Sequence, residues 1–145
     1  MTQSQTDFVD YLRTLALGQH EENDRIEERL DATGWIGYPR FIATAFFLAV
    51  DRHFTQPADA GEIIRFVAAI RSQVPPDGPT VDQDLAEKLI RSVLDDSVTV
   101  DRSATDPEMV GKIQSLVVYH ILTEGMKNED ELNAFLAEVA RSATR

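Results

Sequence analysis

Residues 62–94, EIIRFVAAIRSQVPPDGPTVDQDLAEKLIRSVL, and residues 109–141, MVGKIQSLVVYHILTEGMKNEDELNAFLAEVAR, carry the pattern that decides the fold. Shifted by 47 residues, the first stretch lies on the second with apolar positions matched: Ile63 with Val110, Phe66 with Ile113, Leu85 with Leu132, Leu89 with Leu136. Each stretch has apolar residues at helical spacing on both sides of a turn. The sequence therefore predicts a duplicated helix–loop–helix, with repeat units 59–96 and 106–142. The alternative is a chance alignment of two amphipathic hairpins, because helix starts favour acidic residues.

The segment before the first repeat predicts the centre of the fold. Phe41 to Val50 is the longest apolar run in the chain, ten residues, which is about half the length that a membrane span needs. Pro39 suits a first helical turn, where its missing N–H is not needed. A helix that is apolar all round belongs inside a bundle, so we expect a central buried helix near residues 39–54.

Helix start signals divide the rest of the chain. Thr80 followed by Gln83 has the spacing of a capping box, and the helix it opens is expected from Val81. Asp59, Asp106 before Pro107, and Asn128 are further candidate caps. The sequence predicts one all-α domain over residues 1–145, a bundle of about six helices, with frayed ends at 1–6 and 142–145.

Composition limits the function. Hydrophobic residues make up 43% and charged residues 27%, as in a globular domain, and the lack of cysteine excludes thiolate chemistry. The net charge of −11 is spread evenly along the chain, which disfavours binding to nucleic acid or to anionic lipid. The start of the chain lacks a basic region and carries Asp7 and Asp10, so we expect no secretory signal and a cytoplasmic location.

Acidic residues gather in the two turns of the predicted repeat, at 77–84 and 124–131. Hard divalent cations need several converging oxygen ligands, and the candidate ligands are Asp77, Asp82, Asp84, Glu124, Glu129 and Glu131. The spacing does not match an EF-hand. The acid–glycine turns are similar to those of TerB-type tellurite-resistance domains, a resemblance confined to these two loops. The alternative to a divalent cation as cofactor is that these carboxylates cap helices.

Few residues suit catalysis. Glu124 follows His120 by one helical turn, and the pair could act as a general base. His53 is an optional third member of this candidate site. The motifs of zincins, di-iron proteins, serine hydrolases and phosphate-binding loops are all missing from the sequence. The sequence leaves open whether the chain is an enzyme, although the missing motifs favour a non-enzyme. The alternative for His120 is a hydrogen-bonded core histidine.

Residues 35–41, WIGYPRF, form the densest aromatic cluster and follow an acidic helix predicted over 19–31. Tryptophan, tyrosine and arginine are common interface anchors, so Trp35, Tyr38 and Arg40 are the candidate partner-binding residues. The alternative is that the aromatic rings close the end of the bundle. The leading prediction is a non-catalytic, cytoplasmic protein-interaction module whose partner is another protein or a second copy of the chain. The cation-binding loops and a small helical enzyme using His120 and Glu124 are the alternatives.

Overall fold

The computed structural model describes residues 3–54, 59–74, 80–126 and 128–143. These residues contain seven α-helices, a 3-10 turn at Arg102–Ala104 and no strand. The all-α prediction is confirmed, with one helix more than the expected number. The helices are α1 (Gln3–Ala16), α2 (His20–Thr33), α3 (Tyr38–His53), α4 (Ala60–Ser72), α5 (Gln83–Leu94), α6 (Pro107–Gly125) and α7 (Glu129–Ala143). Helix therefore extends into both segments that were expected to fray.

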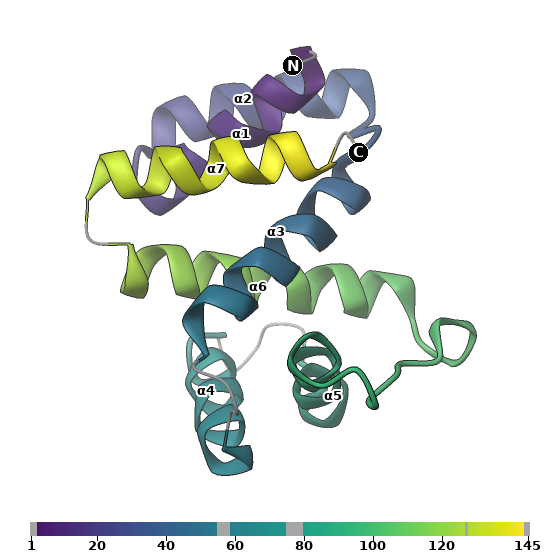
Figure 1. Cartoon of the computed structure of the whole chain (residues 1–145). Helices are drawn as coiled ribbons and strands as arrows, with labels where there is room; N and C mark the ends of the chain where they lie inside the picture. Colours follow the sequence, from purple (N-terminus) through teal and green to yellow (C-terminus); the bar gives the residue numbers. More distant parts are fainter. Residues whose placement is uncertain (1–2, 55–58, 75–79, 127, 144–145) are drawn as a thin grey trace.

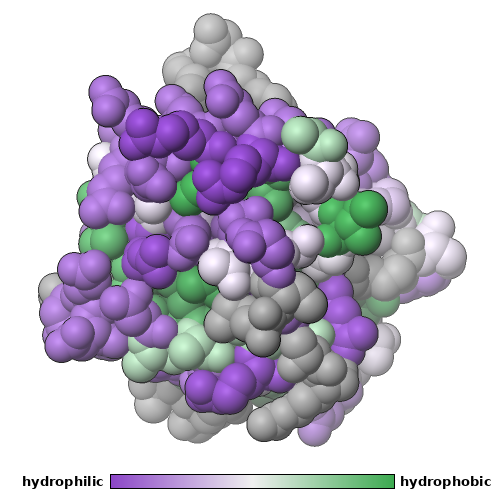
Figure 2. Space-filling view, turned by 90° about the horizontal axis from the view of Figure 1, so that it is seen from above, coloured by the Kyte–Doolittle hydropathy of each residue, from purple (hydrophilic) through white to green (hydrophobic). Residues whose placement is uncertain are grey.

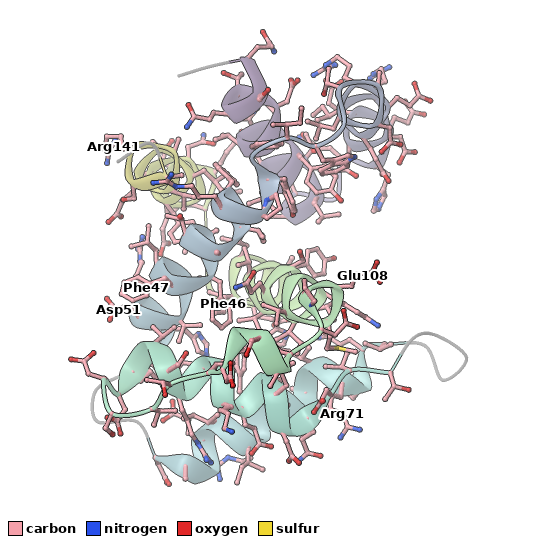
Figure 3. The ribbon with its side chains drawn as sticks, turned by 90° about the vertical axis from the view of Figure 1, so that its right-hand side faces the viewer. Phe46, Phe47, Asp51, Arg71, Glu108 and Arg141 are labelled. Carbon is pink, nitrogen blue, oxygen red and sulfur yellow. The ribbon has the colours of Figure 1, made fainter. Side chains whose placement is uncertain are left out.

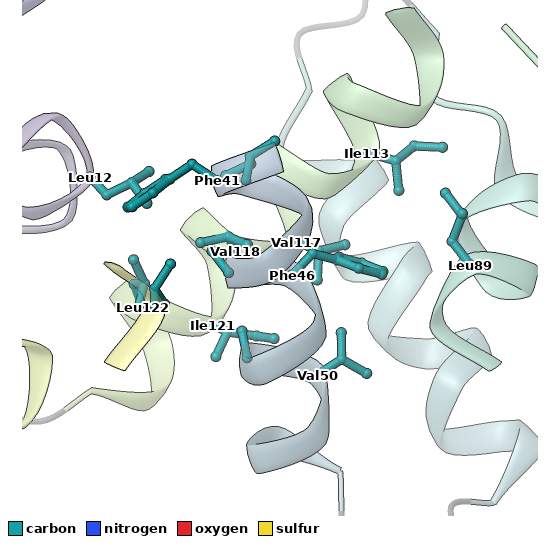
Figure 4. Close-up of a cluster of buried hydrophobic side chains, with 14 of the residues drawn as sticks. Leu12, Phe41, Phe46, Val50, Leu89, Ile113, Val117, Val118, Ile121 and Leu122 are labelled. Carbon is teal, nitrogen blue, oxygen red and sulfur yellow. The ribbon is translucent and has the colours of Figure 1, made fainter. Parts of the chain in front are cut away.

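Helix α3 is the centre of the molecule, as predicted. It packs most extensively against α6 and also contacts α7, α5 and α1. Figure 1 shows α3 crossing α6, with α1, α2 and α7 at one end of the molecule and α4 and α5 at the other. The α3 residues that face the core are Phe41, Ile42, Ala45, Phe46, Ala49 and Val50. Figure 4 shows Phe41, Phe46 and Val50 among the apolar side chains of α6, with Leu12 of α1 and Leu89 of α5 at the edges.

The structure does not show the predicted repeat. Helix α4 packs against α5, whereas α6 and α7 pack chiefly against α3. The members of the second pair are also longer, at 19 and 15 residues against 13 and 12. Asp77 and Gly78 lie outside the described residues. The apolar positions align because all four helices have amphipathic spacing. Two helix pairs can share this spacing and still pack differently.

Side-chain caps fix where several helices begin. Asp59, Asp82 and Asp106 accept hydrogen bonds from the backbone N–H groups of Gly61, Leu85 and Glu108. Asn128 Oδ1 accepts from Glu131 N at 2.7 Å. The predicted caps at Asp59, Asp106 and Asn128 are thus confirmed. The predicted cap of α5 is wrong, because the N-cap residue is Asp82 and not Thr80, and the helix begins at Gln83.

The neighbouring residues Phe46 and Phe47 provide a matched test of the central helix. Phe46 is 4% exposed and Phe47 is 52% exposed, and Figure 3 shows the two on different sides of α3. We expect Phe46→Ala to lower the free energy of unfolding by about 3–5 kcal/mol, because it leaves a cavity in the core. Phe47→Ala should change it by less than about 1 kcal/mol.

Urea denaturation followed by circular dichroism measures both values. Equal losses for the two variants would contradict the placement of α3.

Candidate functional site

The turn between α2 and α3 has an unusual backbone. Gly34, Trp35 and Gly37 have φ angles of +93°, +58° and +90°. Gly34 ends α2 in the left-handed conformation, and its N–H donates to Leu30 O at 2.8 Å. A glycine adopts this conformation freely, but a bulky residue such as Trp35 does so only at a cost of about 1–3 kcal/mol. The surrounding contacts must therefore hold Trp35 in place.

An aromatic cluster supplies those contacts. Trp35 meets the rings of Tyr11 and Tyr38 edge-on, with centroid distances of 5.1 and 5.0 Å. Tyr38 also meets Phe8 at 5.3 Å. Trp35 Nε1 donates to Asp31 Oδ1 at 2.7 Å. Trp35 and Tyr38, which the sequence proposed as partner-binding residues, are therefore both half-buried against the hydrophobic core.

The exposed part of this region is Ile36, at the tip of the turn. Ile36 is 80% exposed, the highest value among the large hydrophobic residues of the described chain. It borders a hollow of about 230 Å³ that Arg40 and Gly37 also line. A second hollow of about 400 Å³ adjoins it, lined by Arg40, Phe47 and their neighbours on α3. Ile36, Arg40 and Phe47 thus lie along one continuous surface, which we call the α3 surface.

Ile36 and Phe47 were not singled out in the sequence. The position of Ile36 between two turn glycines was a signal of exposure. Phe47 gave no such signal, since it lies within a run of apolar residues.

Helix α2 next to this turn presents an acidic face. Its exposed carboxylates are Glu21, Glu22, Asp24, Glu27, Glu28 and Asp31. Arg25 pairs with Glu22 at 2.8 Å, and Arg29 pairs with Asp7 of α1 at 3.0 Å. Seen from above the view of Figure 1, where α2 lies, the surface is largely hydrophilic (Figure 2).

A buried polar contact holds α2 against α1. Asn23 Nδ2 donates to Tyr11 O at 2.9 Å and to Thr14 Oγ1 at 3.1 Å, while Ile26 and Leu30 are buried on the same side. The acidic face of α2 therefore lies opposite the buried side that carries Ile26 and Leu30.

The hydroxyl groups of the cluster are kept neutral. Burial raises the pKa of Tyr11 to about 12, with further contributions from Tyr38, Glu27 and Asp31. Burial also raises the pKa of Tyr38, although a hydrogen bond with Ser115 works in the opposite direction. Neither phenol is thus suited to act as a general base near neutral pH.

Two of the candidate metal ligands have other partners. Asp82 caps α5, and Glu131 lies 3.8 Å from Arg52. Asp77 lies outside the described residues. Within the described ranges, no three histidine or carboxylate side chains come together in a group that would hold a metal ion. The contacts of Asp82 and Glu131 correspond to helix capping and ion pairing.

The candidate catalytic pair is not joined by any contact in the part of the chain that the structure describes. His120 Nδ1 lies 3.3 Å from Gln73 Oε1 instead of bonding to Glu124. The rings of His53 and His120 pack on Phe66, with centroid distances of 5.0 and 5.2 Å. Burial lowers the pKa of His53, His120 lowers it further, and Glu62 opposes the shift. These histidines are part of an aromatic cluster at the contact of α3, α4 and α6.

Comparison of the chain with protein-family models, curated proteins and solved structures finds no match. The similarity of the two acidic loops to TerB-type domains thus gains no support. None of the described helices is long and apolar enough to cross a membrane.

The raised pKa of Tyr11 predicts a loss of stability at alkaline pH. Below pH 10 the phenol is neutral in both the folded and the unfolded chain, so its contribution to stability is fully present. Between about pH 10 and 12 the unfolded chain releases this proton and the folded chain keeps it. The free energy of unfolding should therefore fall with rising pH in this window.

Tyr11→Phe should make that fall smaller, which urea denaturation at several pH values measures. An unchanged pH dependence in Tyr11→Phe would contradict the burial of this hydroxyl.

Proposed function

We propose that the chain is a protein-binding module that recognises a basic, amphipathic segment of a partner protein. The binding surface comprises the acidic face of α2 and the adjoining α3 surface. The observation that carries the proposal is Ile36, a large apolar side chain exposed at the tip of a strained turn and next to an acidic helix. Backbone strain of this kind is concentrated at functional sites.

Charge defines the kind of partner. Helix α2 exposes six carboxylates, and its two arginines are both in ion pairs with acidic residues. Complementary charge steers association and selects partners. The chain as a whole carries −11, so a second copy would meet it with charge of the same sign. A basic partner therefore fits better than self-association.

The apolar residues provide the anchor. Interface energy is concentrated in a few buried side chains surrounded by polar ones. Ile36 and Phe47 are the apolar members of the α3 surface, and Arg40 lies between them. Trp35 fixes the turn through Asp31 and Tyr11, so Ile36 is held outward before a partner arrives. Such preorganisation lowers the entropy lost on binding.

A synthetic helix made only of lysine and leucine, with leucine at every third or fourth position, tests this proposal. We expect it to bind in isothermal titration calorimetry and to bind less tightly as salt is added. A glutamate–leucine helix of the same spacing should not bind. Ile36→Ser should weaken binding by about tenfold or more, because it removes the apolar anchor.

Matched variants control for folding and for total charge. Ile64→Ser changes a 43% exposed isoleucine on α4 and should leave binding unchanged. Glu27→Gln with Glu28→Gln should weaken binding more than Asp84→Asn with Asp96→Asn, which removes as much charge from the α5 end of the molecule.

Equal effects of Ile36→Ser and Ile64→Ser would contradict the proposal. So would a dimer in sedimentation that dissociates in Ile36→Ser, because the partner of the α3 surface would then be a second copy.

A further inference from the structure

A separate groove lies between the N-terminal halves of α3 and α6. It encloses about 450 Å³, and its walls include Tyr38, Ile42 and Ala43 of α3 and Val110, Gly111 and Gln114 of α6. This volume is in the range of sites that bind small molecules, about 300–1,000 Å³. Its walls are mostly apolar, with a small number of polar groups, as such sites usually are.

Gln114 is the most buried of the polar side chains that line the groove. It is only 4% exposed, and its amide makes no hydrogen bond with any part of the chain that the structure describes. All fully enclosed side-chain nitrogen and oxygen atoms of those residues do have partners. The amide of Gln114 is therefore not fully enclosed, and Gln114 is one of the residues that line the groove.

Gly111 is a second unusual residue in the same wall. It lies inside α6, where glycine is the least favourable residue apart from proline. A Cβ atom added at Gly111 would meet nothing within 4 Å, so packing against other residues does not explain the glycine. Its effect is to widen the groove beside Gln114 and to expose the helix backbone to whatever occupies it.

The remaining polar groups narrow the choice of ligand. Tyr38 and Ser115 share a hydrogen bond, and Thr105 and Lys112, which also line the groove, each have an interaction of their own. Among the described residues that line the groove, the Gln114 amide is therefore the polar group for which no partner is found. An amide presents a carbonyl oxygen beside an N–H₂ group, and the complementary edge is another planar group with adjacent C=O and N–H. We propose that this groove binds a small, flat, mostly apolar molecule with a cyclic amide edge, held by two hydrogen bonds to Gln114.

The benzo-fused lactam carbostyril is the probe, and its N-methyl derivative, which lacks the N–H donor, is the matched control ligand. We expect carbostyril to bind in isothermal titration calorimetry and to shift the amide resonances of α3 and α6. N-methylation should weaken binding about tenfold, because one hydrogen bond is lost and the Gln114 carbonyl is left without a partner. Gln114→Met, which has a similar size and no amide, should make the two ligands bind equally.

Gly111→Leu separates binding from folding. It should raise the unfolding temperature, since leucine is the better helix former, while its side chain fills the groove and abolishes binding. Gly125→Leu is the control on the same helix, because a Cβ atom there also meets nothing within 4 Å and Gly125 does not line the groove. It should leave binding unchanged.

Three results would each overturn the proposal: no binding of carbostyril, equal binding of the two ligands to the original chain, or full binding by a folded Gly111→Leu variant.

Discussion

The packing of α3 against α6 is the contact on which the other helices depend. Ala45 and Ala49 of α3 are fully buried, and small residues let two helices approach closely. Larger side chains of α3, such as Phe41, Phe46 and Val50, lie among the apolar side chains of α6 (Figure 4). Helices α1 and α7 then cover one end of this crossing and α5 covers the other. Two amphipathic hairpins packed side by side would not need so apolar a helix between them.

Much of this arrangement could be predicted from the sequence, because it depends on local signals. The apolar run from Phe41 to Val50 marks a buried helix, and the caps at Asp59, Asp106 and Asn128 act over a distance of two or three residues. The failures concern properties that only the packed structure determines. Phe47 differs from Phe46 in exposure and not in chemistry, and a periodic pattern does not show which helix will pack against which. The structure does not show the predicted repeat for the same reason.

The candidate sites show the same difference between local signals, which the sequence carries, and burial, which only the packed structure determines. The sequence shows a dense group of aromatic residues around residue 35, and the structure shows their rings in contact, but the sequence does not tell which of these residues pack against the core. Trp35 and Tyr38 contact the core, while Ile36 between them is exposed. The acidic residues divide in a similar way, because Asp82 is used as a helix cap and Glu131 as an ion-pair partner. The carboxylates of α2 are left facing solvent. The even spread of charge along the sequence therefore hides one helix with six exposed carboxylates, of which Glu22 pairs with Arg25 and Asp31 holds Trp35.

Tyr38 connects the two proposed sites. Its ring supports Trp35 and Phe8 beneath the turn, and its hydroxyl reaches Ser115 in the groove. A substitution of Tyr38 would disturb both surfaces and would not show which of them binds a ligand. Ile36 belongs to the α3 surface alone and Gly111 to the groove alone. Because neither residue belongs to the hydrophobic core, each can be substituted without removing a core side chain. The proposed partner-binding surface and the proposed small-molecule groove can therefore be tested independently.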